Sequence, residues 1–321
     1  MIADLRDVYR LAGEELQAVE REMQAALTTL EPRLAAAVEY FFSSSGKRMR
    51  PLMTILSARL GQARQEPLVK AAAALELIHL GSLVHDDVVD EATTRRGQPS
   101  VNARFDNQTA VLLGDFFFAR ALTLAREAGS DAVQAVAEII SHLVEGELEQ
   151  QSRSFDVSLT EADYWSRIER KTAWFLAESC RLGCIYGVDN PLQPDELHSF
   201  GRHLGLAYQV KDDLLDFVGL EEQVGKPTRR DLQDGVITLP VIHVLQHHPR
   251  REEIAGWITT SVDDNWAEVI CCLRESGSLE FAEGKAAELV EQAKRYLAPA
   301  PEQKEKQALL YLADFVLTRV S

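Results

Sequence analysis

Residues 77–90 read LIHLGSLVHDDVVD, and residues 210–216 repeat the polar centre of that stretch as VKDDLLD. Both segments follow one pattern: valine, any residue, two aspartates, two apolar residues and a third aspartate. Residues four apart share one face of an α-helix, so the first and last aspartates of each triplet project together, with the middle one beside them. The pattern predicts two helices that each carry a carboxylate triplet in an apolar context.

Stacked carboxylates repel one another, and an apolar setting raises that cost. A divalent cation offsets the repulsion, and Mg²⁺ in particular binds through one or two carboxylates, water and substrate phosphate oxygens. A single triplet is also explained by a solvated acidic face or a helix terminus, but two such triplets favour Mg²⁺, with Mn²⁺ as an alternative metal. The predicted metal ligands are Asp86, Asp87, Asp90, Asp212, Asp213 and Asp216.

Basic residues accompany the triplets. Arg95 and Arg96 follow the first triplet, Lys226 lies in a basic run after the second, and GKRMRP occupies residues 46–51. Arginine forks hold phosphate oxygens bidentately, and lysine supplies a point charge. Surface basic residues explain any one cluster, but three clusters near turns, two of them beside the triplets, indicate phosphate binding. The predicted ligand is a metal-bound polyphosphate.

The rest of the chain has helical periodicity. No proline interrupts residues 100–190, and Asp234-Gly235 is the one Asn-Gly or Asp-Gly dipeptide, so hairpin signals are scarce. No linker or composition shift marks a boundary, which predicts one all-α domain over residues 1–321. The longest apolar stretches, 71–84 and 110–125, contain charges and fall short of the ~18 residues of a membrane span. We therefore expect no membrane span.

Composition restricts the partners and the compartment. With 34 Lys and Arg against 50 Asp and Glu, the formal net charge is −16, which argues against nucleic acid or an anionic membrane as the main partner. The N-terminal stretch lacks the basic-then-apolar layout of a signal peptide, and we expect a cytoplasmic protein. The cysteines have neither disulfide-framework nor zinc spacing and are expected to be buried thiols. They are Cys180, Cys184, Cys271 and Cys272.

Six stretches together resemble one enzyme family. They are GKRMRP (46–51), LIHLGSLVHDDVVDEATTRRG (77–97), GDFFFARA (114–121), ERKTA (169–173), YQVKDDLLDF (208–217) and GKPTRRDLQDG (225–235) followed by TLP. Over most of its length the chain is similar to the trans-prenyltransferases, the polyprenyl diphosphate synthases of the farnesyl diphosphate synthase superfamily. The resemblance implies an all-α, isoprenoid-synthase-type bundle around a deep central cavity, and a homodimer. It also implies Mg²⁺-dependent head-to-tail (1′–4) condensation of isopentenyl diphosphate with an allylic diphosphate, geranyl or farnesyl.

The same resemblance implies roles for single residues. The two triplets are implied to face each other across the cavity mouth, with Asp86, Asp90, Lys171 and Asp212 as catalytic residues. The allylic diphosphate is implied to bind Arg95, Lys171 and Lys226. Isopentenyl diphosphate is implied to bind Gly46, Lys47, Arg50, His79 and Arg96. Thr172 and Gln209 are implied to stand beside the carbocation and the departing diphosphate.

Three of these residues have ordinary structural alternatives when each is taken alone. His79 is also explained as a core histidine on an apolar helix, and Gln209 as a buried amide. Thr172 is also explained by a hydroxyl that bonds back to its own helix. The combined pattern is what favours the functional interpretation.

Product length depends on the residues before the first triplet. In one helix over residues 71–90, Ile78, Gly81 and Ser82 lie one to two turns deeper than Asp86. In the family, aromatic residues at the fifth and fourth positions before the first aspartate resemble the cavity floor of short-chain synthases. Here Gly81 and Ser82 are expected to leave the channel open, with close helix packing at Gly81 as the alternative. We expect a long product of about C35–C50, octaprenyl favoured, for a quinone side chain.

Several alternatives stay open. The chain could be a short-chain farnesyl or geranylgeranyl diphosphate synthase, or the catalytic subunit of a heteromeric prenyl synthase. A class I terpene cyclase or head-to-head synthase would also carry aspartate-rich helices, but it would not need GKRMRP and RRG for a second diphosphate. A non-catalytic subunit would be expected to have eroded triplets, whereas both are intact.

Overall fold

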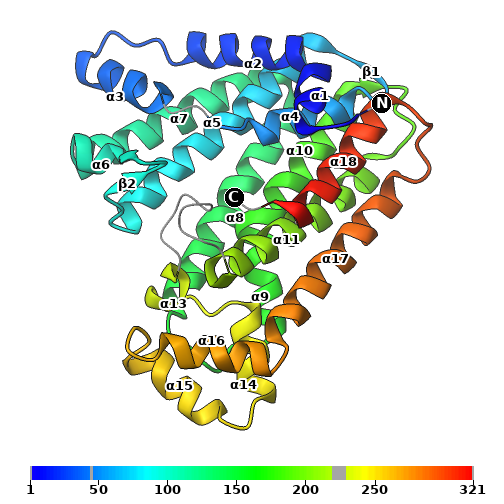
Figure 1. Cartoon of the computed structure of the whole chain (residues 1–321). Helices are drawn as coiled ribbons and strands as arrows, with labels where there is room; N and C mark the ends of the chain where they lie inside the picture. Colours follow the sequence, from blue (N-terminus) through cyan, green and yellow to red (C-terminus); the bar gives the residue numbers. More distant parts are fainter. Residues whose placement is uncertain (1, 44–45, 219–228, 320–321) are drawn as a thin grey trace. The chain divides into compact units, whose positions relative to one another are not determined.

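The computed structural model describes residues 2–43, 46–218 and 229–319, and the chain there is built of helices (Figure 1). The helices of the first half are α1 (Leu5–Leu11), α2 (Gly13–Ala26), α3 (Pro32–Ser43), α4 (Met49–Ala58), α5 (Gln65–Val89), α6 (Val101–Arg104), α7 (Asn107–Ala128) and α8 (Ser130–Ser152). They are followed by α9 (Glu161–Ile168), the π-helix η1 (Glu169–Ala173), α10 (Trp174–Tyr186), α11 (Pro194–Val218), α13 (Arg230–Gln233), α14 (Leu239–His247), α15 (Arg251–Thr260), α16 (Trp266–Glu275), α17 (Ser278–Leu297) and α18 (Lys304–Thr318). The predicted all-α fold is confirmed.

The chain groups into two compact units. One contains residues 1–140, 178–198 and 297–311, and the other contains residues 141–177, 199–296 and 312–321. Helices α8, α10, α11, α17 and α18 contribute residues to both units. The single domain and the deep central cavity expected from the sequence stay predictions.

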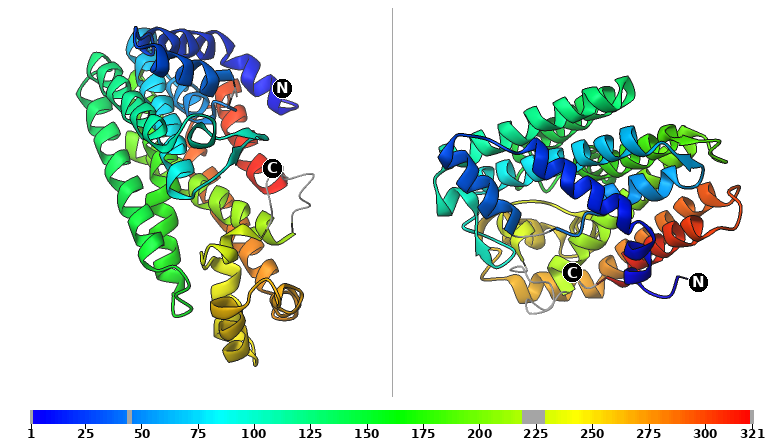
Figure 2. Two further views of the ribbon diagram at one scale, coloured as in Figure 1. Left: turned by 90° about the vertical axis from the view of Figure 1, so that its left-hand side faces the viewer. Right: turned by 90° about the horizontal axis from the view of Figure 1, so that it is seen from above.

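Helix α5 forms the core of the first unit. Residues 71–78 are all buried, and α5 packs along α7, with α2 and α4 also against it (Figure 1 and Figure 2). Glycines allow the close approach of α5 and α7. A Cβ atom added to Gly81 would lie 2.6 Å from Phe118 Cε1, and one added to Gly114 would lie 2.2 Å from His85 Nε2.

The contact at Gly81 corrects one expectation. The space beside this glycine is filled by Phe118 and by the backbone of α7, so Gly81 does not leave a channel open in this structure. Close helix packing, the alternative considered from the sequence, accounts for the glycine. Ile78 is fully buried, whereas Ser82 is half-buried and its hydroxyl donates to the His79 carbonyl at 2.9 Å.

Two short antiparallel pairings tie loops of the first unit together. Strand β1 (Gln62–Ala63) pairs with β4 (Gly187–Val188), and β2 (Thr94–Arg95) pairs with β3 (Gln98–Pro99). The turn between β2 and β3 is tight because Arg96 and Gly97 both have positive φ, 52° and 75°. This hairpin directly follows the first aspartate triplet and fixes the backbone of Arg95.

The second unit has its own apolar core. Helices α9, α14, α15 and α16 contribute to one cluster of buried side chains that includes the fully buried Tyr164, and α15 and α16 pack on α14 (Figure 1). Helix α9 begins with a capping box, in which the Thr160 hydroxyl accepts from the Asp163 backbone while the Asp163 carboxylate accepts from the Thr160 backbone. The cap fixes where α9 starts and therefore where η1 follows.

Helices α5 and α7 exceed the length expected for their apolar stretches. By length and composition alone, both helices are long and apolar enough to cross a membrane. The expectation that the apolar segments 71–84 and 110–125 are too short for a span was therefore wrong. In α5, 72% of the apolar window is buried within the protein, as in the core helix of a soluble protein; in α7 the share is 44%. Two such helices are weak evidence, and the absence of a membrane span stays a prediction, as does the cytoplasmic location.

The cysteines are free thiols, and the expectation of burial holds for all but one. Cys180, Cys184 and Cys272 are buried, whereas Cys271 is exposed on α16 and donates to Glu275 at 3.3 Å. Cys271 lies on the solvent face of α16, next to the buried Cys272.

Candidate active site

The first aspartate triplet lies at the carboxyl-terminal end of α5. Asp90 is the residue that caps the helix, and its backbone N–H donates to the Asp86 carbonyl at 2.8 Å. The end of a helix with unsatisfied carbonyls carries partial negative charge, so carboxylates there add to a field that already favours a cation. Asp86 is half-buried, Asp87 is buried and Asp90 is exposed.

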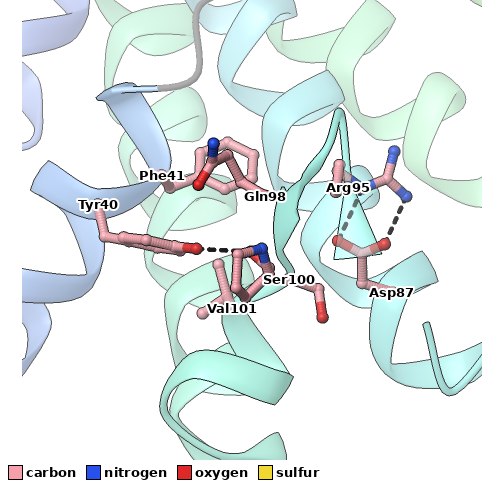
Figure 3. A pocket seen from close by; sticks show the side chains of 8 residues that line it. Tyr40, Phe41, Asp87, Arg95, Gln98, Ser100 and Val101 are labelled. Carbon is pink, nitrogen blue, oxygen red and sulfur yellow. Dashed lines mark hydrogen bonds and ion pairs between the residues drawn. The ribbon is translucent and has the colours of Figure 1, made fainter. Parts of the chain in front are cut away.

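Asp87 is held by Arg95 of the hairpin. Arg95 Nε lies 2.7 Å from Asp87 Oδ2 and Nη2 lies 2.7 Å from Oδ1, a bidentate pair (Figure 3). The pair lines a pocket of about 320 Å³, together with Tyr40, Phe41 and Ser100. Arg95 was expected to bind the allylic diphosphate, and in this structure its fork faces a carboxylate of the triplet.

The residues expected to hold isopentenyl diphosphate come together in the first unit. A Cβ atom on Gly46 would lie 3.3 Å from both terminal nitrogens of Arg96, so this glycine allows the guanidinium a close approach to the backbone. His79 is partly buried, and its pKa is lowered well below 6.5, first by burial and then by the nearby charges of Arg50 and Arg96. The site is therefore strongly basic, with a neutral imidazole inside it. Lys47, on the same segment, is exposed.

The second triplet lies in the last two turns of α11, again at the negative end of a long helix. Arg319 Nη2 lies 2.5 Å from Asp212 Oδ1. Asp216 accepts from the backbone N–H groups of Arg230 and Asp231, both at 3.3 Å. Asp213 is buried.

A chain of hydrogen bonds leads to Asp213. The Thr172 hydroxyl donates to Gln209 Oε1 at 2.7 Å, Gln209 Nε2 donates to Asp213 Oδ1 at 2.8 Å, and the Tyr164 hydroxyl donates to Oδ2 at 2.7 Å. Thr172 thus bonds across to Gln209, where the alternative considered from the sequence was a bond to its own helix. Lys171 is paired with Glu147 at 2.6 Å.

Lys171 and Thr172 lie on the π-helix η1, where each turn holds an extra residue. A Cβ atom on Gly146 would lie 3.2 Å from the Lys171 backbone nitrogen, so this glycine lets α8 approach the widened turn. The wider turn and the close approach of α8 together set where both side chains leave the helix.

Negative charge accumulates around the second triplet. Burial raises the pKa of Asp213 to about 6, and it also raises the pKa of Asp216. The pKa of Asp231 lies well above its usual value because of burial and the repulsion of the three triplet carboxylates. This surplus of carboxylate oxygens is the donor set that a hard divalent cation prefers, so the residues present fit Mg²⁺. Within residues 2–43, 46–218 and 229–319, no group of three or more His, Cys, Asp or Glu side chains could hold a metal ion as it stands.

Sequence reasoning missed several residues of these sites. Four of them lie close to a predicted site residue: Asp231 is repelled by the second triplet, Tyr164 donates to Asp213, Glu147 pairs with Lys171, and Arg319 pairs with Asp212. A fifth, the buried Glu76, bonds to Arg48 of the basic segment 46–51. Only Asp231, inside the basic run after the second triplet, had a visible signal. Lys226 lies outside the described residues.

Comparison with known proteins agrees with the resemblance. The family model described as "Polyprenyl synthetase" matches residues 31–273. "Heptaprenyl diphosphate synthase component 2" of Geobacillus stearothermophilus is 35% identical over 97% of this chain and 98% of that protein. The crystal structure of a polyprenyl synthase from Caulobacter crescentus, complexed with calcium and isoprenyl diphosphate, superposes with a TM-score of 0.92 at 34% identity, covering 99% of this chain and 98% of the other. A decaprenyl diphosphate synthase from Rhodobacter capsulatus gives the same TM-score at 30% identity, covering 98% and 99%.

Proposed function

Because the chain belongs to the polyprenyl synthetase family, whose medium- and long-chain members are prenyltransferases, we propose that it extends an allylic diphosphate with isopentenyl diphosphate. The allylic substrate is geranyl or farnesyl diphosphate, and the units join head to tail. The observation that carries the proposal is the pair of carboxylate triplets at the negative ends of α5 and α11, each accompanied by basic residues.

The basic segment and its neighbours bind isopentenyl diphosphate. Gly46 gives Arg96 access, Lys47 and Arg50 supply charge, and the neutral His79 imidazole has one N–H that can donate to a diphosphate oxygen. Two arginine forks suit diphosphate oxygens because they bind bidentately. Binding in a fixed orientation removes most of the entropy cost of bringing two substrates together.

The second substrate is held through the triplets. Asp86, Asp87, Asp90, Asp212, Asp213 and Asp216 would hold Mg²⁺, or Mn²⁺ in its place. When bound, the metal supplies charge neutralisation on the leaving diphosphate. Lys171 and Lys226 add positive charge on the allylic side, and Arg95 holds the Asp87 carboxylate in place through a bidentate ion pair. The calcium in the complex of the Caulobacter protein supports a divalent site of this kind.

Thr172 and Gln209 stabilise the intermediate allylic cation. Their side chains are joined by a hydrogen bond and anchored on Asp213, so their oxygen dipoles are fixed before the reaction starts. The double bond of isopentenyl diphosphate attacks the allylic cation, and the proton lost afterwards is taken by an oxygen of the departing diphosphate. Apolar surroundings must exclude water, because water would capture the cation.

We propose a product of about C35–C50, octaprenyl favoured, destined for a quinone side chain. Support comes from relatives named for heptaprenyl and decaprenyl products. The small Ser82 at the fourth position before Asp86 is consistent with a long product, whereas Gly81 carries no such argument because Phe118 fills its surroundings.

A homodimer is part of the proposal. Helix α7 exposes Val111, Leu112 and Leu122 by 41%, 56% and 44%, and α8 exposes Val144 and Leu148 by 53% and 61%. Large apolar side chains gathered on exposed helix faces are typical of subunit interfaces. Sedimentation of the purified chain should give a dimer, and Leu112→Glu should shift it to monomer.

A heteromeric enzyme is the second candidate, because the Geobacillus relative is named as one component of its synthase. One experiment separates the two. The purified chain is incubated with isopentenyl diphosphate and geranyl or farnesyl diphosphate, with Mg²⁺ or with EDTA, and the dephosphorylated products are separated by length. A long-product ladder from this chain alone, abolished by EDTA, supports the proposal; activity only after a partner is added would favour the heteromer.

A further inference from the structure

Helix α4 is tied to α2 at both ends by an arginine. At its start, Arg48 Nε lies 3.1 Å from Glu20 Oε2, and Arg48 Nη1 lies 3.2 Å from Glu76 Oε1. At its end, Arg59 Nη1 lies 3.4 Å from Glu15. The two pairings are alike in chemistry, but only the first adjoins the basic segment 46–51.

Glu76 makes the Arg48 pairing costly to break. This α5 carboxylate is 2% exposed, and its Oε2 has no hydrogen-bond partner among the described residues. Burial raises the pKa of Glu76, while the charges of Arg48 and Arg50 oppose that rise. Removing Arg48 would leave the buried Glu76 carboxylate without this ion-pair partner, which is destabilising. The pairing therefore holds the Arg48 guanidinium at this position.

The backbone beside Arg48 is held in an unusual conformation. Arg48 has φ 48° and ψ 38°, the left-handed region that side chains other than glycine rarely adopt. Such a residue persists when surrounding contacts determine it, and here the carboxylates of Glu20 and Glu76 do so. The turn brings Gly46 against Arg96, and a Cβ on Gly46 would also lie 3.4 Å from Arg48 Nη1.

Tyr9 of α1 holds the same segment from another side. Its hydroxyl donates to the Lys47 carbonyl. Burial and the charge of Glu76 raise the pKa of Tyr9 to about 12, so the hydroxyl keeps the proton that this bond requires. Contacts from α1, α2 and α5 thus converge on two consecutive residues, Lys47 and Arg48.

We propose that Arg48, Glu76 and Tyr9 are positioning residues that fix the backbone of the isopentenyl diphosphate site. Arg48 is not itself a ligand of the diphosphate; it holds Gly46, Lys47 and Arg50 in the arrangement that binds it. The inference rests on the proposed function, because it concerns how that site is built.

The test measures binding of isopentenyl diphosphate without turnover, by calorimetry with no allylic substrate present. Arg48→Met is compared with Arg59→Met, which breaks the similar pairing at the other end of α4. We expect Arg48→Met to weaken binding at least 10-fold and Arg59→Met less than 2-fold, with similar losses of melting temperature. Tyr9→Phe removes one hydroxyl without opening a cavity and should weaken binding about 3-fold.

Steady-state kinetics give a second measurement on the same variants. Tyr9→Phe should raise KM for isopentenyl diphosphate about 3-fold and leave KM for the allylic substrate within 1.5-fold, a split that general destabilisation would not produce. Equal effects of Arg48→Met and Arg59→Met, together with wild-type behaviour of Tyr9→Phe, would overturn the positioning role while the proposed function stands. A wild-type chain that does not bind isopentenyl diphosphate would overturn the proposed function, and the positioning role with it.

Discussion

Arg319 and Asp212 form an ion pair at the end of the chain: Nη2 lies 2.5 Å from Oδ1, and the guanidinium carbon lies 3.7 Å from the centroid of the Tyr208 ring. The Arg319 side chain is 3% exposed, whereas that of Asp212 is 41% exposed. The pair places a fixed cation beside a carboxylate that also faces Asp213 and Asp231.

Replacing this cation should make the protein more dependent on Mg²⁺. Arg319→Met leaves Asp212 among like charges, and since Asp212 is partly exposed we expect a loss of about 1–2 kcal/mol without metal. Mg²⁺ should restore part of that loss, so it should raise the melting temperature of the variant more than that of the wild type. Thermal unfolding with Mg²⁺ or EDTA checks this, with Lys285→Met, which breaks the ion pair with Glu288 on α17, as the control. An equal response of both proteins to Mg²⁺ would refute the prediction.

Removing the first aspartate of either triplet should abolish turnover. We expect Asp86→Ala and Asp212→Ala each to lower kcat by about 10³-fold or more, because the charge on the leaving diphosphate is no longer neutralised. Single-turnover assays with and without EDTA measure this, and Glu288→Ala on α17 should keep normal rates. Near-normal rates in both aspartate variants would show that the metal ligands are assigned wrongly.

A methyl group at Gly81 should destabilise the protein. Gly81→Ala puts a carbon 2.6 Å from Phe118 Cε1, and overpacking of this kind costs about 1–3 kcal/mol, more than the ~1 kcal/mol that alanine gains in a helix. Gly284→Ala is the matched control, since nothing lies within 4 Å of that position on α17. Urea unfolding should show a loss for Gly81→Ala, recovered by adding Phe118→Leu, and a small gain for Gly284→Ala. Stabilisation by both alanines would mean that Phe118 moves aside freely.

Product length should respond at Ser82 and not at Gly81. Ser82 is half-buried. Among the contacts described, its hydroxyl bonds only to the preceding turn of its own helix, so a larger side chain breaks no hydrogen bond to another helix. Ser82→Phe should shorten the product ladder toward farnesyl or geranylgeranyl length while the first condensation survives. Gly81→Phe should instead disrupt the packing of α5 on α7. An unchanged ladder from a folded Ser82→Phe enzyme would place the determinant of length elsewhere.

His79 should make the protein sensitive to acid. Burial and the charges of Arg50, Arg96, Arg95 and Arg48 hold its pKa below the 6.5 of an unfolded chain, so the native state binds fewer protons than the unfolded state once the pH falls below 6.5. Stability is therefore lost as the pH falls through this range, by at most about 1.4 kcal/mol at pH 5.5. Denaturation at pH 7.5 and 5.5 should show a smaller loss for His79→Asn than for wild type.

The sequence was informative where local spacing decides structure. Both triplets lie on long helices, as the periodicity predicts, although the periodicity did not indicate that they would lie near the helix ends. Contacts that depend on tertiary packing could not be foreseen. Nothing near Asp212 in the sequence points to Arg319, and whether Gly81 borders a channel or a helix depends on where Phe118 of α7 lies. The bidentate pairing of Asp87 with Arg95 likewise requires the exact turn at Arg96 and Gly97.

The π-helix at Glu169–Ala173 has a consequence for how this chain can vary. One residue fewer in that segment would restore ordinary helical winding and rotate everything on one side by about 100° relative to the other. Tyr164 would then leave the apolar core of its unit, or Lys171 and Thr172 would leave their partners. A substitution here changes the contacts of one residue. An insertion or deletion changes the orientation of Tyr164 relative to Lys171 and Thr172. Among related chains this segment should therefore keep a constant length.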